Sequence, residues 1–129
     1  MPFVTRRVKP AYDVLAPDKS EVRLLATIGR GSMAHFRLGA GLVSHAVYHR
    51  GVEELWYFTA GRGRVWRKMG VEEEVTEVGA GDSISIPTGA AFQFRCDSKE
   101  PLEFVGVTMP PWPGADEAVP TEGAWPATA

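Results

Sequence analysis

The sequence has a single cysteine, no long apolar run and no strong excess of one charge. Cys96 cannot form an intrachain disulfide, which fits a reducing compartment. No apolar run approaches the ~20 residues that a membrane-spanning helix needs, and the N-terminus lacks the apolar segment of a secretory signal. A net charge of −2 disfavours nucleic acid and anionic membranes as partners. These absences predict a cytoplasmic protein.

A helical period is also lacking, and short β-type runs take its place. The 14 glycines and 10 prolines separate runs rich in β-branched and aromatic residues. The predicted strands are 22–28, 33–38, 44–49, 55–59, 63–68, 73–78, 83–86, 92–96 and 102–108. Many short strands at regular spacing predict an all-β sandwich or barrel, and 129 residues suffice for one such domain.

The two ends of the chain differ from its middle. Residues 1–21 carry three prolines and little periodicity, so we expect an extended N-terminal segment. Residues 22–109 hold the predicted barrel. Residues 110–129 are rich in proline but contain Trp112 and Trp125, and disordered tails are usually poor in aromatic residues. We therefore expect this tail to pack on the barrel or on a partner subunit.

Two stretches resemble the sequence motifs of the cupin superfamily. In the first, His49 is followed after four residues by Glu54 and after six more by Gly61. In the second, Gly81, Pro87 and Gly89 keep the family spacing. The resemblance implies an antiparallel jelly-roll barrel, the cupin double-stranded β-helix. It also implies a metal inside the barrel, held by three histidines and one glutamate.

The metal-binding motif is incomplete in this chain. His49 and Glu54 match two ligand positions of the family, but Val47 and Phe92 occupy the other two histidine positions. Valine and phenylalanine offer no lone pair to a metal, so the favoured interpretation is that no cofactor is bound. In the alternative, divalent Fe, Mn, Ni or Zn is held by His45, His49 and Glu54, because residues 45, 47 and 49 of one strand share a face.

Other polar residues near the motifs are expected to face away from the interior. Gln93 alternates with two phenylalanines and should point outward. His35 lies on a strand whose alternate residues form the core face, so it should face solvent. Arg67 faces inward in one register of its strand and outward in the other, and an inward Arg67 would bind a carboxylate or phosphate.

Aromatic residues replace the missing ligands on the inward face. The residues expected to bind a ligand are Trp56, Phe58, Arg67, Phe92 and Phe94. Mostly apolar walls around a few polar groups are typical of a small-molecule pocket, although side chains alone fill the interior of many small barrels. A His49–Glu54 pair, hydrogen-bonded together or to a ligand, could act as acid and base without metal, since a nearby carboxylate raises the pKa of an imidazole.

Three functions follow from these observations. The first is a small-molecule-binding cupin with an aromatic pocket around His49 and Glu54, in which catalysis is undecided. The second is a metal-dependent enzyme of the isomerase or dioxygenase type that uses His45, His49 and Glu54, whereas the resemblance to metal-free epimerases of the cupin class implies that the first could also be catalytic. The third is a non-catalytic interaction module. A homodimer is expected in each case, because small cupins commonly pair through their sheets and a free sheet edge is readily closed by another chain.

Overall fold

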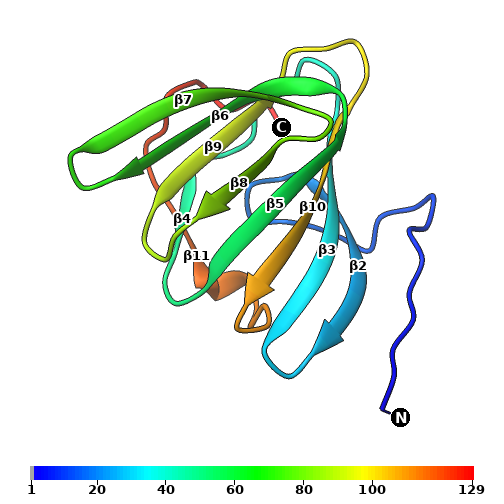
Figure 1. Cartoon of the computed structure of the whole chain (residues 1–129). Coiled ribbons are helices and arrows are strands. Elements are labelled where there is room, and N and C mark those ends of the chain that lie inside the picture. Colours follow the sequence, from blue (N-terminus) through cyan, green and yellow to red (C-terminus); the bar gives the residue numbers. More distant parts are fainter. Residues whose placement is uncertain (1) are drawn as a thin grey trace.

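Two antiparallel sheets form the fold of this chain, of which the computed structural model describes residues 2–129 (Figure 1). The six-stranded sheet has the order β1–β2–β3–β10–β5–β8, and the five-stranded sheet has the order β11–β4–β9–β6–β7. The strands are β1 Val14–Leu15, β2 Glu21–Ile28, β3 Gly31–Leu38, β4 Val47–His49, β5 Glu53–Ala60, β6 Arg62–Met69, β7 Glu72–Gly79, β8 Ser83–Ile86, β9 Ala91–Cys96, β10 Leu102–Met109 and β11 Ala118–Pro120.

The predicted all-β fold is confirmed, and the nine predicted runs correspond to strands β2 to β10. The sequence pattern missed β1 and β11, which have two and three residues and are too short to show a period. The run predicted to start at Ser44 forms a strand only from Val47. Before Val47 the backbone does not continue the β4–β9 pairing. The backbone N–H of His45 instead donates to the carbonyl of Asp18, in the turn before β2, at 3.0 Å. Within residues 2–129 the only helix is a single 3-10 turn, η1 (Ala115–Glu117).

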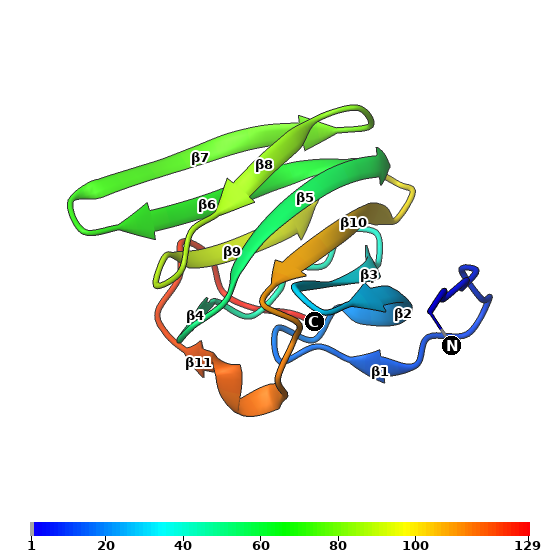
Figure 2. The same cartoon turned by 60° about the horizontal axis from the view of Figure 1, so that its bottom comes forward.

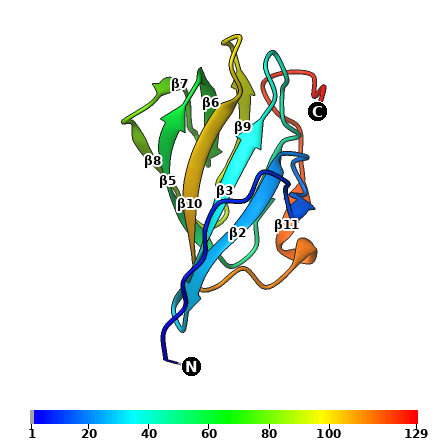
Figure 3. The same cartoon turned by 90° about the vertical axis from the view of Figure 1, so that its right-hand side faces the viewer.

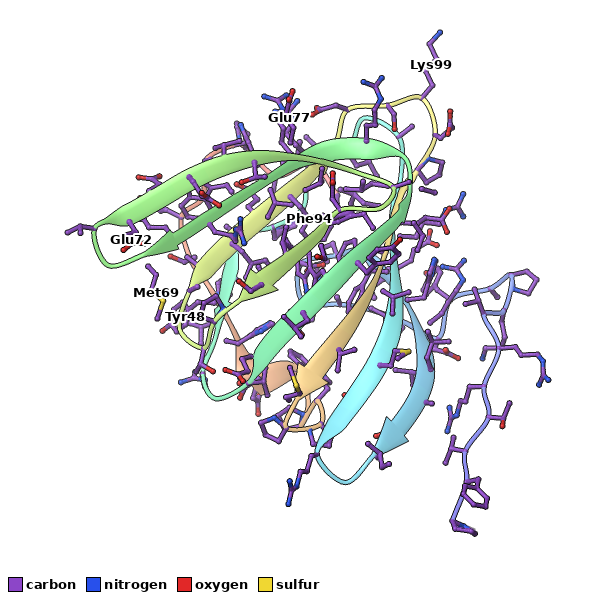
Figure 4. All side chains as sticks on the ribbon, viewed as in Figure 1. Tyr48, Met69, Glu72, Glu77, Phe94 and Lys99 are labelled. Carbon is purple, nitrogen blue, oxygen red and sulfur yellow. The ribbon has the colours of Figure 1, made fainter. Side chains whose placement is uncertain are left out.

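An aromatic core lies between the sheets, because inward side chains alternate with outward ones along each strand. Figure 4 shows Phe94 in this interior. Strand β5 follows the alternation throughout, with Glu54, Trp56 and Phe58 buried and their neighbours exposed. The Trp56 ring stacks on Phe104 with centroids 4.2 Å apart, and Phe94 meets the same Phe104 ring edge-on. These three rings belong to one buried hydrophobic cluster between the sheets.

The C-terminal segment crosses from one sheet to the other. After β10 the chain leaves the six-stranded sheet and reaches β11, which pairs with β4 of the five-stranded sheet (Figure 2). Trp112 packs against the core on the way, and its backbone N–H donates to Ser32 Oγ at 3.0 Å. Further on, the backbone N–H of Trp125 donates to Gln93 Oε1 at 3.0 Å. The tail therefore covers an outer face of β9.

The N-terminal segment begins away from the barrel and then runs beside β2 of the six-stranded sheet (Figure 3). The Arg23 guanidinium donates to the carbonyls of Lys9 and Pro10, each at 2.7 Å. His35 lies opposite Arg23 in the β2–β3 register and is 7% exposed, with Nε2 2.9 Å from Glu103 Oε1. The prediction that His35 faces solvent is thus wrong. It lies on the outward face as expected, but neighbouring side chains bury it there. No helix among residues 2–129 is long and apolar enough to cross a membrane.

Candidate functional site

A cavity of about 430 Å³ opens between the two sheets beside the aromatic core. We call it the central cavity. Its aromatic walls come from Phe36 on β3, Trp56 on β5, Phe92 on β9 and Trp112 in the C-terminal segment. The polar side chains that line it and are buried by their surroundings are Asp18, His49, Glu54 and Thr108. A concave apolar surface with a few polar groups is the usual form of a small-molecule site.

Glu54 is held in the wall of the central cavity by two hydrogen bonds. The indole N–H of Trp56 donates to Oε1 at 2.8 Å, and the Thr108 hydroxyl donates to Oε2 at 2.7 Å. Trp56 is two residues further along β5, and Thr108 is opposite Glu54 on β10, so the strand register sets both contacts. Burial raises the pKa of Glu54, and the two hydrogen bonds only partly oppose that rise.

His49 ends strand β4 and meets the cavity between two aromatic rings. Its imidazole contacts Phe92 and Trp112 edge-on, with centroids 5.1 Å away in both cases. Its Nδ1 is buried and has no hydrogen-bond partner among residues 2–129. Burial lowers the pKa of His49, while the nearby carboxylates of Asp18 and Glu117 act in the opposite direction. The imidazole is therefore held in its neutral form more strongly than a histidine in water.

Of the two arrangements expected for His49 and Glu54, a hydrogen bond to each other or to a ligand, the first is not formed. Both oxygens of Glu54 accept hydrogen bonds from Trp56 and Thr108, and His49 is absent from the causes that shift the pKa of Glu54. The expectation that a neighbouring carboxylate would raise the pKa of His49 is wrong in its net direction, because desolvation outweighs the carboxylates. The two side chains line one cavity but do not form a hydrogen-bonded pair.

Asp18 is a functional candidate that the sequence analysis missed. It is 6% exposed and lines the central cavity from the turn before β2. Its Oδ1 accepts from the backbone N–H and the hydroxyl of Ser20, at 2.9 and 2.6 Å. Burial raises the pKa of Asp18 and the charge of Glu54 adds to the rise, while the hydrogen bonds from Ser20 and the charge of His49 oppose it. The local pattern of Asp18 and Ser20 predicts only a turn, so nothing in the sequence connected Asp18 with His49.

The aromatic residues predicted to bind a ligand divide into two groups. Trp56 and Phe92 line the central cavity. Phe58 and Phe94 do not line it; both are completely buried in the core. All four face inward as predicted, but alternation along a strand does not tell how far along the barrel axis the packed region extends.

Arg67 faces the space between the sheets but not the central cavity. One guanidinium nitrogen donates to the carbonyl of Ser85 on β8 of the opposite sheet at 2.9 Å, and another binds Glu74. Its neighbour Trp66 takes the other face, where the indole N–H donates to Glu73 at 2.7 Å. Arg67 is therefore inward, but it joins the two sheets, and its part in ligand binding stays a prediction.

His45 and Gln93 lie on the far side of β4 and β9 from the central cavity. The exposed imidazole of His45 lies 3.1 Å from the carbonyl of Ala129, and it lines a smaller hollow under the C-terminal tail. The expectation that His45 shares a face with His49 is not met, since the alternation starts only where the strand does, at Val47. Gln93 faces outward as expected, and its amide donates to the carbonyls of Ser44 and Trp125, each at 2.8 Å.

A family model for the cupin domain matches residues 34–108, which is more than half of the chain. This chain belongs to the cupin family. The match spans both sequence motifs and includes His49, Glu54 and Phe92 of the central cavity, whereas Asp18 lies before it. A search of curated protein sequences finds no match.

Solved structures similar to this cupin have low sequence identity and support the fold alone. A conserved protein with a double-stranded β-helix domain from Klebsiella pneumoniae is 16% identical, with a TM-score of 0.65, over 92% of this chain and 91% of that one. A predicted oxalate decarboxylase from Thermotoga maritima is 18% identical, with a TM-score of 0.67, over 83% and 98%. KdgF from Halomonas is 14% identical, with a TM-score of 0.62, over 84% and 88%.

The residues of this cupin do not fit the metal that the family resemblance implies. Val47 and Phe92 are almost completely buried beside His49 and offer no ligand atom. His45 lies outside the cavity, so His49 and Glu54 are the two family ligand positions that keep a ligand atom there. Across residues 2–129, no three His, Cys, Asp or Glu side chains are grouped closely enough to hold a metal ion. A transition metal usually has at least three protein ligands, which this donor set does not supply.

Proposed function

We propose that this cupin binds a small organic molecule in the central cavity. The observation that carries the proposal is a cavity of about 430 Å³ with aromatic walls, in which the buried Nδ1 of His49 has no hydrogen-bond partner among residues 2–129. Buried polar atoms are normally paired, so atoms left unpaired beside a cavity favour a ligand that pairs with them. Glu54 and neutral His49 in one apolar cavity also suit proton transfer to or from a bound molecule.

The two other functions considered from the sequence are less well supported. A metal-dependent enzyme needs a ligand set that His45, His49 and Glu54 do not form together. A pure interaction module would have a completely filled barrel, whereas Glu54 borders open space. Oxalate, suggested by the similar protein from Thermotoga maritima, is a small dianion and is poorly matched to a cavity with two buried carboxyl groups.

We expect a probe that fits the central cavity to bind saturably. The probes are 2-phenylethanol and 2-phenylethylamine, which have the same shape and are respectively neutral and cationic. Binding is measured by titration calorimetry and by the fluorescence of Trp56 and Trp112, which line the cavity. The variant Ala34→Leu adds volume inside the cavity and is expected to lower the affinity at least tenfold, whereas Ala40→Leu on an exposed loop leaves it unchanged.

Two results would overturn the proposed function. One is the absence of saturable binding of either probe, and the other is equal affinity in Ala34→Leu and Ala40→Leu, both checked for folding by circular dichroism. Metal analysis of the protein purified without a histidine tag tests the alternative. Stoichiometric Fe, Mn, Ni or Zn that is lost in His49→Ala would favour the metal-dependent enzyme.

We also propose that the chain forms a homodimer through the outer face of the six-stranded sheet. Leu55 and Tyr57 are 54% and 53% exposed there, and they lie beside Val107 and Val105 in the strand register, which makes the apolar patch continuous. Uncharged patches of this kind mark interfaces, and a two-fold axis lets the same patch cover its copy.

Light scattering at micromolar concentration is expected to give the mass of two chains for the wild type and of one chain for Tyr57→Glu. The control Val75→Glu changes an equally exposed residue, at 52%, on the other sheet and is expected to stay dimeric. A monomeric wild type, or a dimer that only Val75→Glu disrupts, would contradict the proposed interface.

A further inference from the structure

We infer that the ligand of the central cavity is a cation: a small molecule with an apolar or aromatic body and a protonated amine, held by the carboxyl groups of Asp18 and Glu54. This inference rests on the proposed function, because it names the chemical class of the molecule that the cavity binds. It depends on three features of the cavity, namely the sign of its buried charges, the free acceptors on its two acids and the nature of its walls.

The charged groups that face the central cavity from inside the barrel are acidic. Asp18 and Glu54 are 6% and 5% exposed, and the charge of Glu54 raises the pKa of Asp18. Among the described side chains, the only lysine or arginine that lines the cavity is Arg6, on the exposed N-terminal segment. Solvent screens a charge at that position. The buried base of the cavity is His49, and burial favours its neutral form, so two buried acids beside it are balanced best by a positively charged ligand.

The two acids also retain the hydrogen-bonding capacity that an ammonium group needs. Ser20 occupies only Oδ1 of Asp18, and no side chain or backbone group among residues 2–129 donates to Oδ2. Each oxygen of Glu54 accepts one hydrogen bond and can accept a second. An ammonium group has three N–H donors and no acceptor, so it matches a site that offers acceptors from two directions.

The walls of the central cavity suit the rest of such a molecule. Trp56, Phe92, Phe36 and Trp112 line it from four different segments of the chain. Aromatic faces attract cations, and the attraction increases when water is excluded. The volume of about 430 Å³ is within the range of sites for small organic ligands. The combination of buried acids and aromatic rings therefore favours an amine with an apolar body over a sugar or an organic acid.

The inference is tested with three probes of one shape that differ in charge. Titration calorimetry at pH 7 compares 2-phenylethylamine, 2-phenylethanol and phenylacetate on the wild-type protein. The amine is expected to bind at least tenfold more tightly than the alcohol, and phenylacetate at least tenfold more weakly than the alcohol. Asp18→Asn keeps an Oδ1 acceptor for Ser20. This substitution is expected to lower the affinity for the amine about tenfold and the affinity for the alcohol less than twofold.

The control Asp116→Asn removes an exposed carboxylate outside the cavity and is expected to leave all three affinities unchanged. Glu54→Gln provides a second test if Asp18→Asn does not fold, with the same selective loss for the amine. If the alcohol or phenylacetate binds as tightly as the amine, the inference fails while the proposed function stands. If none of the three probes binds, both fail.

Discussion

Replacing Gly63 with alanine is expected to lower the free energy of unfolding by about 3 kcal/mol or more, the upper range for overpacked sites. A Cβ at this position would lie 2.0 Å from the carbonyl oxygen of Arg95. That oxygen belongs to the backbone of β9, which pairs with β6 in the middle of the five-stranded sheet, so it cannot move without breaking the pairing. The methyl group would also approach Leu102 of the opposite sheet at 3.1 Å.

Urea denaturation measures this effect, and Gly29→Ala is the matched control. A Cβ at Gly29 meets no atom within 4 Å, and the backbone there does not have a positive φ. The control is therefore expected to change the free energy of unfolding by less than about 1 kcal/mol. A Gly63→Ala variant as stable as Gly29→Ala would show that β6 and β9 are not packed as described.

The second large effect is expected from Glu54→Gln, which should stabilise the protein at pH 8 by about 1–2 kcal/mol, the scale typical of single stabilising substitutions. Glutamine keeps the shape of Glu54. Its amide oxygen can accept from the Trp56 indole, and its NH₂ can donate to the Thr108 hydroxyl, so neither neighbour loses its partner. What the substitution removes is the cost of holding a carboxylate in a buried, apolar site.

The pH dependence gives this prediction its sign. Burial raises the pKa of Glu54 above its ordinary value of 4.5, so the folded chain binds more protons than the unfolded chain. The contribution of Glu54 to the stability of the wild type is therefore fully present only below about pH 4.5 and is lost as the pH rises through the pKa of the folded state. The stabilisation by Glu54→Gln is expected to be largest at pH 8 and to disappear near pH 4.

Thermal and urea unfolding of both proteins between pH 4 and pH 8 measure the difference. His49 has the opposite dependence, since its pKa is lowered by burial and its contribution is lost as the pH falls below 6.5, but it is present in both proteins. Glu53→Gln, at the exposed neighbouring position, is the control and should change little at any pH. A Glu54→Gln variant that is less stable than the wild type at pH 8 would contradict the prediction.

A stabilising Glu54→Gln substitution would bear on function as well. A buried carboxylate that lowers stability and can be replaced isosterically is explained by a role outside folding. The proposed amine ligand gives such a role, because a cation between Glu54 and Asp18 would remove the cost of both buried charges. Binding of 2-phenylethylamine is accordingly expected to stabilise the wild type more at pH 8 than the Glu54→Gln variant.

Much of the framework could be predicted from the sequence because its signals are local. Alternation along single strands indicated that Glu54, Trp56 and Phe58 face one side, and the structure buries all three. Gly61 ends the first motif, and glycine is the residue type that suits a turn with positive φ or a close backbone approach. Gly61 has both, with φ of +75° and a Cβ position 2.3 Å from the carbonyl oxygen of Pro101. Such features depend on a few neighbouring residues, which the sequence displays directly.

The composition of the site was decided by tertiary structure. Asp18 reaches His49 across about thirty residues of sequence, through a turn that also binds the backbone of His45 and turns that side chain away from the cavity. Packing between the sheets leaves Trp56 and Phe92 beside open space while it encloses Phe58 and Phe94. Alternation gives the face of a residue but not its depth or its neighbours across the barrel. For this reason the sequence by itself determined a cupin barrel with an incomplete metal motif, and only the assembled sheets produced a cavity with two buried acids.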